Sequence, residues 1–225
     1  MLKIVLTAFM LPLLLLFGLR DGSSSNAPDA AKTIPAKKGE SGTLQKMIVA
    51  SGRVSMDIDL NRIDGVATSR KLQTLHFGVA RGSFFPVLVF NKVLRRAEPG
   101  SMALVPQNNV ALPAALTASF NRLSIEKAHS GEVLGMAVRD AINGFVFFNI
   151  EGNFYYDAST QRLGIQGGRL LISEALANRL GRAREAGTQA GTISIDTAVN
   201  PISTSTVVNG KVESSILPPN NKLVP

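Results

Sequence analysis

The sequence predicts a mainly β protein, built as an antiparallel β-sandwich with one or two short helices. Apolar and polar residues alternate with period two through most of the chain, and Asn-Gly, Asp-Gly and Pro-Gly pairs separate short apolar runs. No helix of about ten or more residues recurs between strands, which argues against parallel βαβ winding. A β-helix or solenoid is the alternative architecture, although no fixed internal period supports it.

The first predicted strand is residues 54–60, where the apolar side chains at even positions would share one face and Asp57 and Asp59 the other. It would form a hairpin with residues 75–81 across the Asp64-Gly65 turn signal. Residues 84–90 are continuously apolar, which is typical of a strand covered on both faces. Further short strands are expected at residues 102–105, 123–127, 133–139, 145–151, 163–165, 170–172, 193–195, 206–208 and 212–216.

Two Asn-Gly pairs predict tight hairpins with type I′ turns. Asn143-Gly144 would join residues 133–139 to 145–151, and Asn209-Gly210 would join the last two strands. One helix is expected at residues 173–181, which begins with an N-cap serine and ends with a glycine. A second short helix is expected at residues 112–119, with its proline in the first turn.

The composition fits a folded chain. Of 225 residues, 45% are hydrophobic and 18% are charged, whereas disordered chains have the opposite balance. The 24 basic and 16 acidic residues give a net charge of +8. The absence of cysteine excludes a disulfide scaffold, thiolate catalysis, zinc–thiolate sites, iron–sulfur clusters and a lipid anchor attached through cysteine.

Residues 1–20 have the pattern of a signal peptide or an N-terminal anchor. After Lys3, residues 4–19 form an uncharged apolar run of 16 residues that contains Pro12. A transmembrane helix needs about 20 such residues, whereas the apolar region of a signal peptide is slightly shorter than this run. We therefore expect an exported bacterial protein, secreted or held in the periplasm or at the cell surface. It would contact a membrane only through residues 4–19, and only if the leader is uncleaved.

The rest of the chain divides into three parts. Residues 21–43 predict a disordered linker, because a stretch rich in Ser, Gly, Ala and Pro cannot bury enough apolar surface to offset the entropy of ordering it. Residues 218–225 predict a flexible tail on the same grounds. Residues 44–217 remain as one β-rich domain, large enough to be stable without a metal or a disulfide.

The sequence around the first predicted turn comes nearest to a metal-binding motif, and it matches a calcium site only weakly. Its candidate ligands are Asp57, Asp59, Asn61 and Asp64. Alternating oxygen ligands in a loop suit Ca²⁺, but Arg62 stands where an EF-hand needs glycine and Thr68 where it needs glutamate. The simpler interpretation is that the acids solvate the outer face of a strand. No other metal and no cofactor are predicted.

Glu151 and Asp157 flank a strand-like stretch that contains the only two tyrosines, Tyr155 and Tyr156. Paired carboxylates beside aromatic side chains are the pattern of a glycosidase cleft, in which a tyrosine could also stack on a sugar ring. Six residues of extended chain would separate these carboxylates by roughly 20 Å, which is too far for an acid–nucleophile pair. The simpler interpretation is that Asp157 flanks a turn and that Glu151 is exposed to solvent.

Two further motifs predict no chemistry. His76 falls in a strand and His129 in a loop, and the chain contains no G-x-S-x-G sequence for a serine nucleophile. The glycines at 164, 167 and 168 precede a strand rather than a helix, so they predict a turn or bulge and not a phosphate-binding loop.

Arg169, Arg179, Arg182 and Arg184 form a basic group late in the chain. If these side chains share one surface, they favour an anionic partner such as a polysaccharide or lipid headgroups. A solvated basic face is the simpler interpretation. No nucleic acid is expected as a partner, because the arginines have no interleaved aromatic residues.

Residues 75–217 also carry motifs of a known kind of module. They are Phe77-Gly78-Val79-Ala80, residues 83–91, Pro99-Gly100-Ser101-Met102, residues 144–152 and residues 167–173. Through these motifs, about two thirds of the chain resembles the N-terminal module of uncharacterised secreted bacterial proteins. The resemblance implies export, a β-rich fold and a longer architecture beyond the proline-rich end, and it implies no activity.

These observations predict an exported, non-catalytic β-rich module for surface binding, adhesion or assembly. Its expected partner is a cell surface or an acidic polymer, or a second copy of the chain through an exposed sheet edge such as residues 145–150. The alternative is an extracellular hydrolase that acts on polysaccharide or another polymer, with Glu151, Asp157 and the two tyrosines as its site.

Overall fold

The computed structural model describes residues 39–64, 72–108, 112, 114–117, 119–127 and 135–217. The predicted leader and tail, most of the predicted linker, and His129 lie outside these residues. No helix within the described residues combines the length and the apolar character needed to cross a membrane.

The described chain is mainly β, as predicted. Its strands are β1 (Gly42–Asp59), β2 (Leu72–Val79), β3 (Pro86–Phe90), β4 (Val93–Ala97), β5 (Gly100–Pro106), β6 (Leu123–Lys127), β7 (Met136–Asp140), β8 (Val146–Glu151), β9 (Phe154–Asp157), β10 (Arg162–Ile172), β11 (Gln189–Val208) and β12 (Lys211–Ile216). Its helices are all short: α1 (Leu60–Asp64), α2 (Ala114–Thr117), α3 (Glu174–Arg179) and the 3₁₀ turns η1 (Phe120–Arg122) and η2 (Ala183–Glu185).

The strands close into a barrel and do not form the two sheets of a sandwich. Eight antiparallel strands make the ring, in the order β1, β2, β5, β6, β7, β8, β10 and β11, and β11 closes it by pairing with β1. The closing ladder is long, because residues 42–58 of β1 pair with residues 191–207 of β11. The predicted β-sandwich is therefore wrong, and the solenoid alternative has no counterpart in this antiparallel ring.

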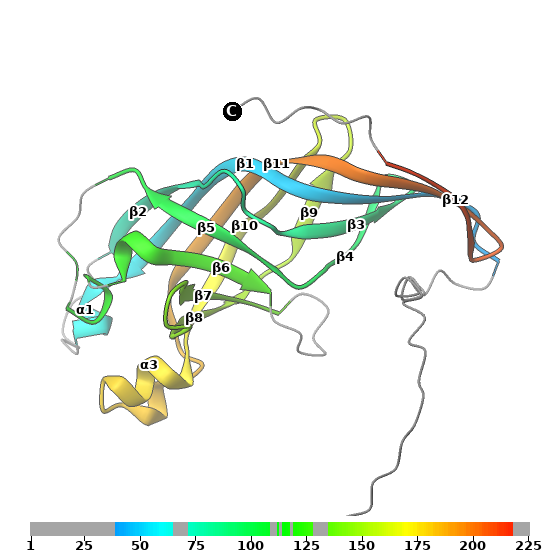
Figure 1. Cartoon of the computed structure of the whole chain (residues 1–225). Coiled ribbons are helices and arrows are strands. Elements are labelled where there is room, and N and C mark those ends of the chain that lie inside the picture. The colour runs from blue at the N-terminus through cyan, green and yellow to red at the C-terminus, as the bar shows by residue number, and fades with distance from the viewer. Residues whose placement is uncertain are drawn as a thin grey trace, which may run out of the picture. The chain divides into compact units, whose positions relative to one another are not determined.

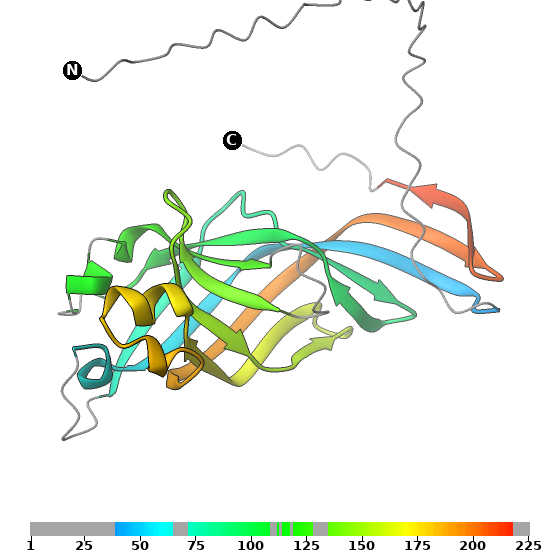
Figure 2. The ribbon, with the colours of Figure 1, turned by 90° about the horizontal axis from the view of Figure 1, so that it is seen from below.

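β1 and β11 run side by side and extend beyond the ring (Figure 1). The first part of β1 pairs with β3 and its last part pairs with β2. β12 adds to the end of β11, and β4 adds to β3. We call the sheet β12-β11-β1-β3-β4 the arm. Figure 2 shows that the arm and the helices α1 and α3 lie at opposite ends of these long strands.

The barrel encloses an apolar core. Val54, Met56 and Ile58 are each at most 2% exposed, which confirms the predicted face of this strand. Phe77 points in from β2, is fully buried, and has its ring centroid 5.3 Å from that of Phe120. A barrel of eight strands is just wide enough for such side chains to fill its interior. The strands of the barrel therefore pack around a filled apolar core.

Two glycines allow the close approach of strands where the barrel closes. A Cβ atom on Gly191 would collide with the Asp57 carbonyl oxygen, and one on Gly52 would lie 2.7 Å from the Asp196 carbonyl oxygen. Because real Cβ atoms do not approach backbone oxygens so closely, any other residue at these positions would push β1 and β11 apart. The closure of the barrel thus depends on glycine at positions 52 and 191.

The two Asn-Gly pairs form different turns. Asn209 and Gly210 have φ angles of 52° and 78°, which confirms the predicted type I′ hairpin between β11 and β12. In the Asn143-Gly144 pair, only the glycine has a positive φ, of 71°. The loop is longer there because the Asp140 carboxylate accepts hydrogen bonds from the backbone N–H groups of Ile142 and Asn143. The predicted tight turn between β7 and β8 is therefore wrong.

The predicted helix after β10 is confirmed as α3. The Ser173 hydroxyl accepts a hydrogen bond from the Leu176 N–H at 2.9 Å, and Gly181 takes a φ of 68° just beyond the helix. The helix contacts β8. β8 itself is paired with β7 on one side and β10 on the other, so residues 145–150 are not the exposed edge that the sequence predicted.

Candidate functional site

A groove of about 350 Å³ lies on the outer wall of the barrel, across β1, β2 and β11. Six polar residues line it: Arg53, Ser55, His76, Gln107, Ser194 and Asp196. Val54 and Phe77, whose side chains are buried, complete the lining. We call this site the outer groove.

Strand register brings these side chains together. Ser55 on β1 stands opposite His76 on β2 and opposite Ser194 on β11. Arg53, two residues earlier on the same face, stands opposite Gly78 and Asp196. Directly paired residues of antiparallel strands point to the same face, with Cβ atoms about 4.5–5.5 Å apart. The alternation that fills the core therefore presents these polar residues together on the outside.

The chain after β5 forms one wall of the outer groove. The Gln107 backbone N–H donates to the His76 carbonyl oxygen at 2.8 Å, and the Asn108 side chain accepts from the His76 N–H at 2.8 Å. The Gln107 amide then lies above Gly78, where an added Cβ would come within 2.8 Å of its Nε2 atom. Gly78 thus leaves the space that this amide occupies.

Arg53 and Asp196 are the charged residues of the outer groove, and Arg162 adjoins it through Asp196. Arg162 holds both carboxylate oxygens of Asp196, with Nε donating to Oδ1 at 2.6 Å and a second nitrogen paired with Oδ2. This bonding raises the pKa of Arg162. Within the described part of the chain, no carboxylate lies at ion-pair distance from Arg53. The two arginines and Asp196 therefore sum to 2 − 1 = +1, with Arg162 lying outside the groove lining.

The two tyrosines of β9 point to opposite sides of the sheet. Tyr155 pairs with Gly164, which pairs in turn with Asp196, so Tyr155 lies on the outer face beside the groove. An added Cβ on Gly164 would come within 2.6 Å of the Tyr155 hydroxyl, so this phenol covers the glycine. Tyr156 packs against the core, and this burial raises its pKa.

The outer groove also places serine beside histidine, as a nucleophile and its base are placed in hydrolases. Among the described residues, no hydrogen bond joins the Ser55 or Ser194 hydroxyl to the His76 ring, and no carboxylate is hydrogen-bonded to that ring. This arrangement offers hydrogen-bonding groups to a ligand and gives no support to an activated nucleophile.

Two of the four predicted calcium ligands accept hydrogen bonds from other residues of the chain. Asp57 Oδ1 accepts a hydrogen bond from the Thr74 hydroxyl at 2.5 Å, and Asp59 Oδ1 accepts one from the Arg62 N–H at 3.4 Å. Asn61 and Asp64 lie on α1. No group of three or more histidine and acidic side chains that could hold a metal ion occurs in the described ranges. The calcium hypothesis gains no support there.

The predicted carboxylate pair does not converge. Glu151 forms an ion pair with Arg169, and the Asp157 carboxylate accepts hydrogen bonds from the Ser159 and Thr160 hydroxyls. These bonds, with Ser159 first, lower the pKa of Asp157 to about 2. Glu151 and Asp157 pair with β10 residues that are 169 − 162 = 7 positions apart, roughly 20 Å along a strand. The structure therefore does not form the predicted hydrolase site.

Three of the four predicted anion-binding arginines have protein partners. Arg169 pairs with Glu151, and the Arg179 guanidinium lies 3.5 Å from the centroid of the Phe145 ring. Arg184 is exposed on η2 and has no ion pair within the described ranges.

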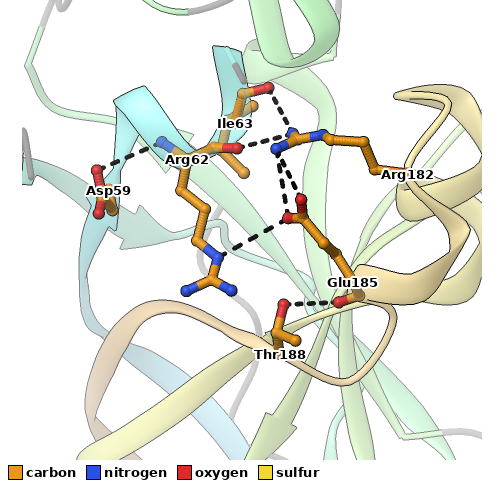
Figure 3. Close-up of polar contacts among 6 residues, drawn as sticks. All are labelled: Asp59, Arg62, Ile63, Arg182, Glu185 and Thr188. Carbon is orange, nitrogen blue, oxygen red and sulfur yellow. Dashed lines mark hydrogen bonds and ion pairs between the residues drawn. The ribbon is translucent and has the colours of Figure 1, made fainter. Parts of the chain in front are cut away.

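Figure 3 shows the environment of the remaining one, Arg182. One of its terminal nitrogens donates to the carbonyl oxygens of Arg62 and Ile63, at 2.7 and 3.1 Å. The other pairs with Glu185 at 3.3 Å. A cation on the last carbonyls of a helix satisfies acceptors that have no partner within the helix. Arg182 thus joins α1 to the segment after α3 and is engaged within the fold.

Arg182→Ala is expected to lower the free energy of unfolding by about 1.5–3 kcal/mol, the usual range for hydrogen bonds to a charged group. The loss follows because the carbonyl oxygens of Arg62 and Ile63 would lose their donor. Urea unfolding of the full chain measures it. Arg184→Ala is the matched control and should change stability by less than about 0.5 kcal/mol. Equal effects of the two substitutions would contradict the assignment.

Comparison with protein-family models finds no family that matches the chain, and comparisons with curated proteins and with solved structures find no match either. The resemblance to secreted bacterial modules therefore stays a prediction.

Proposed function

We propose that this protein is a non-catalytic binding module that works outside the cell and holds a short piece of a hydrophilic polymer in the outer groove. The observation that carries the proposal is the groove itself. Its volume of about 350 Å³ is within the usual range of ligand sites, about 300–1,000 Å³. Hydroxyl, amide, imidazole, carboxylate and guanidinium groups line it, and together they can donate to and accept from a hydroxyl-rich chain.

The position of the outer groove supports a polymeric ligand. A groove on an outer wall admits the middle of a long chain, which an enclosed cavity would not. All of its polar side chains except Gln107 stand on strands that the core holds in place, so most of the hydrogen-bonding groups are arranged before the ligand arrives. The leader-like sequence at residues 1–20 supports action on material outside the cell.

Ser194→Trp tests the proposal by filling the outer groove. Tryptophan is well tolerated at exposed strand positions, so the fold should be retained while the ligand is excluded. We expect affinity for the polymer to fall by at least tenfold, or about 1.4 kcal/mol. Affinity electrophoresis of the full chain against a panel of neutral and acidic polysaccharides, followed by calorimetry on the best ligand, measures it.

The matched control is Ser214→Trp, which places the same side chain on exposed β12, outside the groove. This variant should bind as the unmodified chain does. If both variants lose affinity equally, or if no polysaccharide retards the unmodified chain, the proposed function is wrong.

A further inference from the structure

We infer that the outer groove selects an acidic polysaccharide, a hydroxyl-rich polymer whose units carry carboxylates, and that Arg53 recognises the carboxylate. This inference rests on the proposed function and adds the chemical class of the ligand.

Arg53 is placed to bind an anion. It is exposed on β1, between Gly78 on one neighbouring strand and Asp196 on the other. The space above Gly78 holds the Gln107 amide, a neutral group that leaves the charge of the guanidinium in place. Asp196 does not neutralise it, because both carboxylate oxygens of Asp196 are held by Arg162. A guanidinium binds a carboxylate through two parallel hydrogen bonds, which gives direction as well as charge recognition.

The groups around Arg53 suit the rest of a sugar unit. Ser55 lies two residues along β1 on the same face, at about 7 Å. With Ser194 and Gln107 it offers both donors and acceptors to ring hydroxyls. Tyr155, on the far side of Asp196, presents an aromatic ring on which the next sugar could stack.

The charge of the protein also favours an acidic ligand. Arg53 and Asp196 of the groove, together with the adjoining Arg162 that pairs with Asp196, carry a formal charge of +1, and the whole chain carries +8. A positive protein attracts any polyanion at low salt, so attraction alone would not identify the groove. The test therefore compares the groove with an equal charge elsewhere on the surface.

The experiment measures binding of the full chain to oligogalacturonate and to its methyl ester, which has the same backbone without the charges. The unmodified chain should bind the acid at least tenfold more tightly than the ester. Arg53→Ala should lower affinity for the acid about tenfold and remove the preference over the ester, since a hydrogen-bonded charge pair is worth about 1.5–3 kcal/mol. Arg184→Ala makes the same change in net charge outside the groove and should keep the preference.

The outcomes separate the inference from the proposed function. Equal binding of acid and ester, with binding still sensitive to Ser194→Trp, would overturn the inference and leave the function standing. Equal losses in Arg53→Ala and Arg184→Ala would show attraction by net charge alone and would also overturn it. If neither oligosaccharide nor any member of the panel binds the unmodified chain, both fail. Unchanged thermal unfolding of Arg53→Ala verifies that its loss of binding is local.

Discussion

Phe77→Ala is expected to lower the free energy of unfolding by about 3–5 kcal/mol, the range for deleting a buried phenylalanine ring. Phe77 is fully buried, and its ring packs against Phe120 inside the barrel. The cost depends on how far the surroundings can collapse into the space left behind. Here the surrounding strands are hydrogen-bonded to neighbours on both sides around a closed ring, so little collapse is possible.

Urea unfolding of the full chain measures this effect. Phe84→Ala is the matched control, because it deletes the same atoms from a side chain that is 53% exposed. It should change the free energy of unfolding by less than about 1.5 kcal/mol, since little apolar surface returns to water. Similar losses in the two variants would mean that Phe77 does not lie in a closed core.

Asp140→Asn is expected to lower the Tm by on the order of 10 °C, because a loss of several kcal/mol shifts the Tm of a domain of this size by that much. Asp140 is fully buried at the end of β7. One of its oxygens accepts hydrogen bonds from the Ser119 hydroxyl at 2.6 Å and from Arg122 at 2.8 Å. An asparagine amide would turn a donor toward these donors, or toward the backbone N–H groups on the other oxygen, and would leave Arg122 without its ion pair.

The same carboxylate makes stability depend on pH. Hydrogen bonds, first from Ser119 and then from the backbone N–H groups of Ile142 and Asn143, together with the charge of Arg122, lower its pKa from 3.8 to about 2. Because the folded pKa lies below the unfolded one, the stabilisation is complete above about pH 4 and is lost as the pH falls through 2.

Thermal unfolding between pH 2 and pH 5 tests this dependence. Asp140→Asn should have a shallower fall in Tm below pH 4 than the unmodified chain. Part of the slope should remain, because the pKa of Asp157 is also lowered to about 2. Asp64→Asn, which replaces an exposed carboxylate on α1, should leave the slope unchanged. A parallel fall in Asp140→Asn and the unmodified chain would show that Asp140 does not contribute.

Features encoded by adjacent residues could be predicted from the sequence. The N-cap of α3, the Asn209-Gly210 turn and the apolar face of β1 each depend on a few neighbouring positions, and the structure confirms all three. The bulge in β10 was also indicated by its glycines, since register shifts between Ile165 and Gly168. At Asn143-Gly144 the same reasoning was wrong, because a buried carboxylate from the preceding strand organised the loop.

The closure of the barrel could not be predicted in this way. A sandwich and a barrel share the same alternation along each strand, and they differ in whether the first and last long strands pair. The first part of β1 was missed for a local reason. Register shifts at Lys46/Met47 and Val49/Ser51 break the period of two there, so the alternation is readable only from residue 54 onward.

The outer groove was missed for the same reason as the closure. Ser55 and Ser194 are 194 − 55 = 139 residues apart in sequence and become neighbours only when β1 and β11 pair. The sequence singled out residues close together along the chain, such as Glu151 and Asp157, which the fold separates. The alternation did indicate that Ser55 faces outward, whereas Arg53 precedes the part of β1 where the period of two can be read.

The long strands β1 and β11 also determine how the molecule can open. Each backbone runs from the arm into the barrel without interruption, so strand ends that fray at the tip of the arm can separate without opening the ring only as far as Arg53, where β2 begins to pair with β1. Past that point, each further backbone hydrogen bond broken between β1 and β11 would open the barrel. Slow amide hydrogen exchange should therefore begin near Gly52 and extend through the rest of β1, with the wall of the outer groove inside the most protected part of the protein.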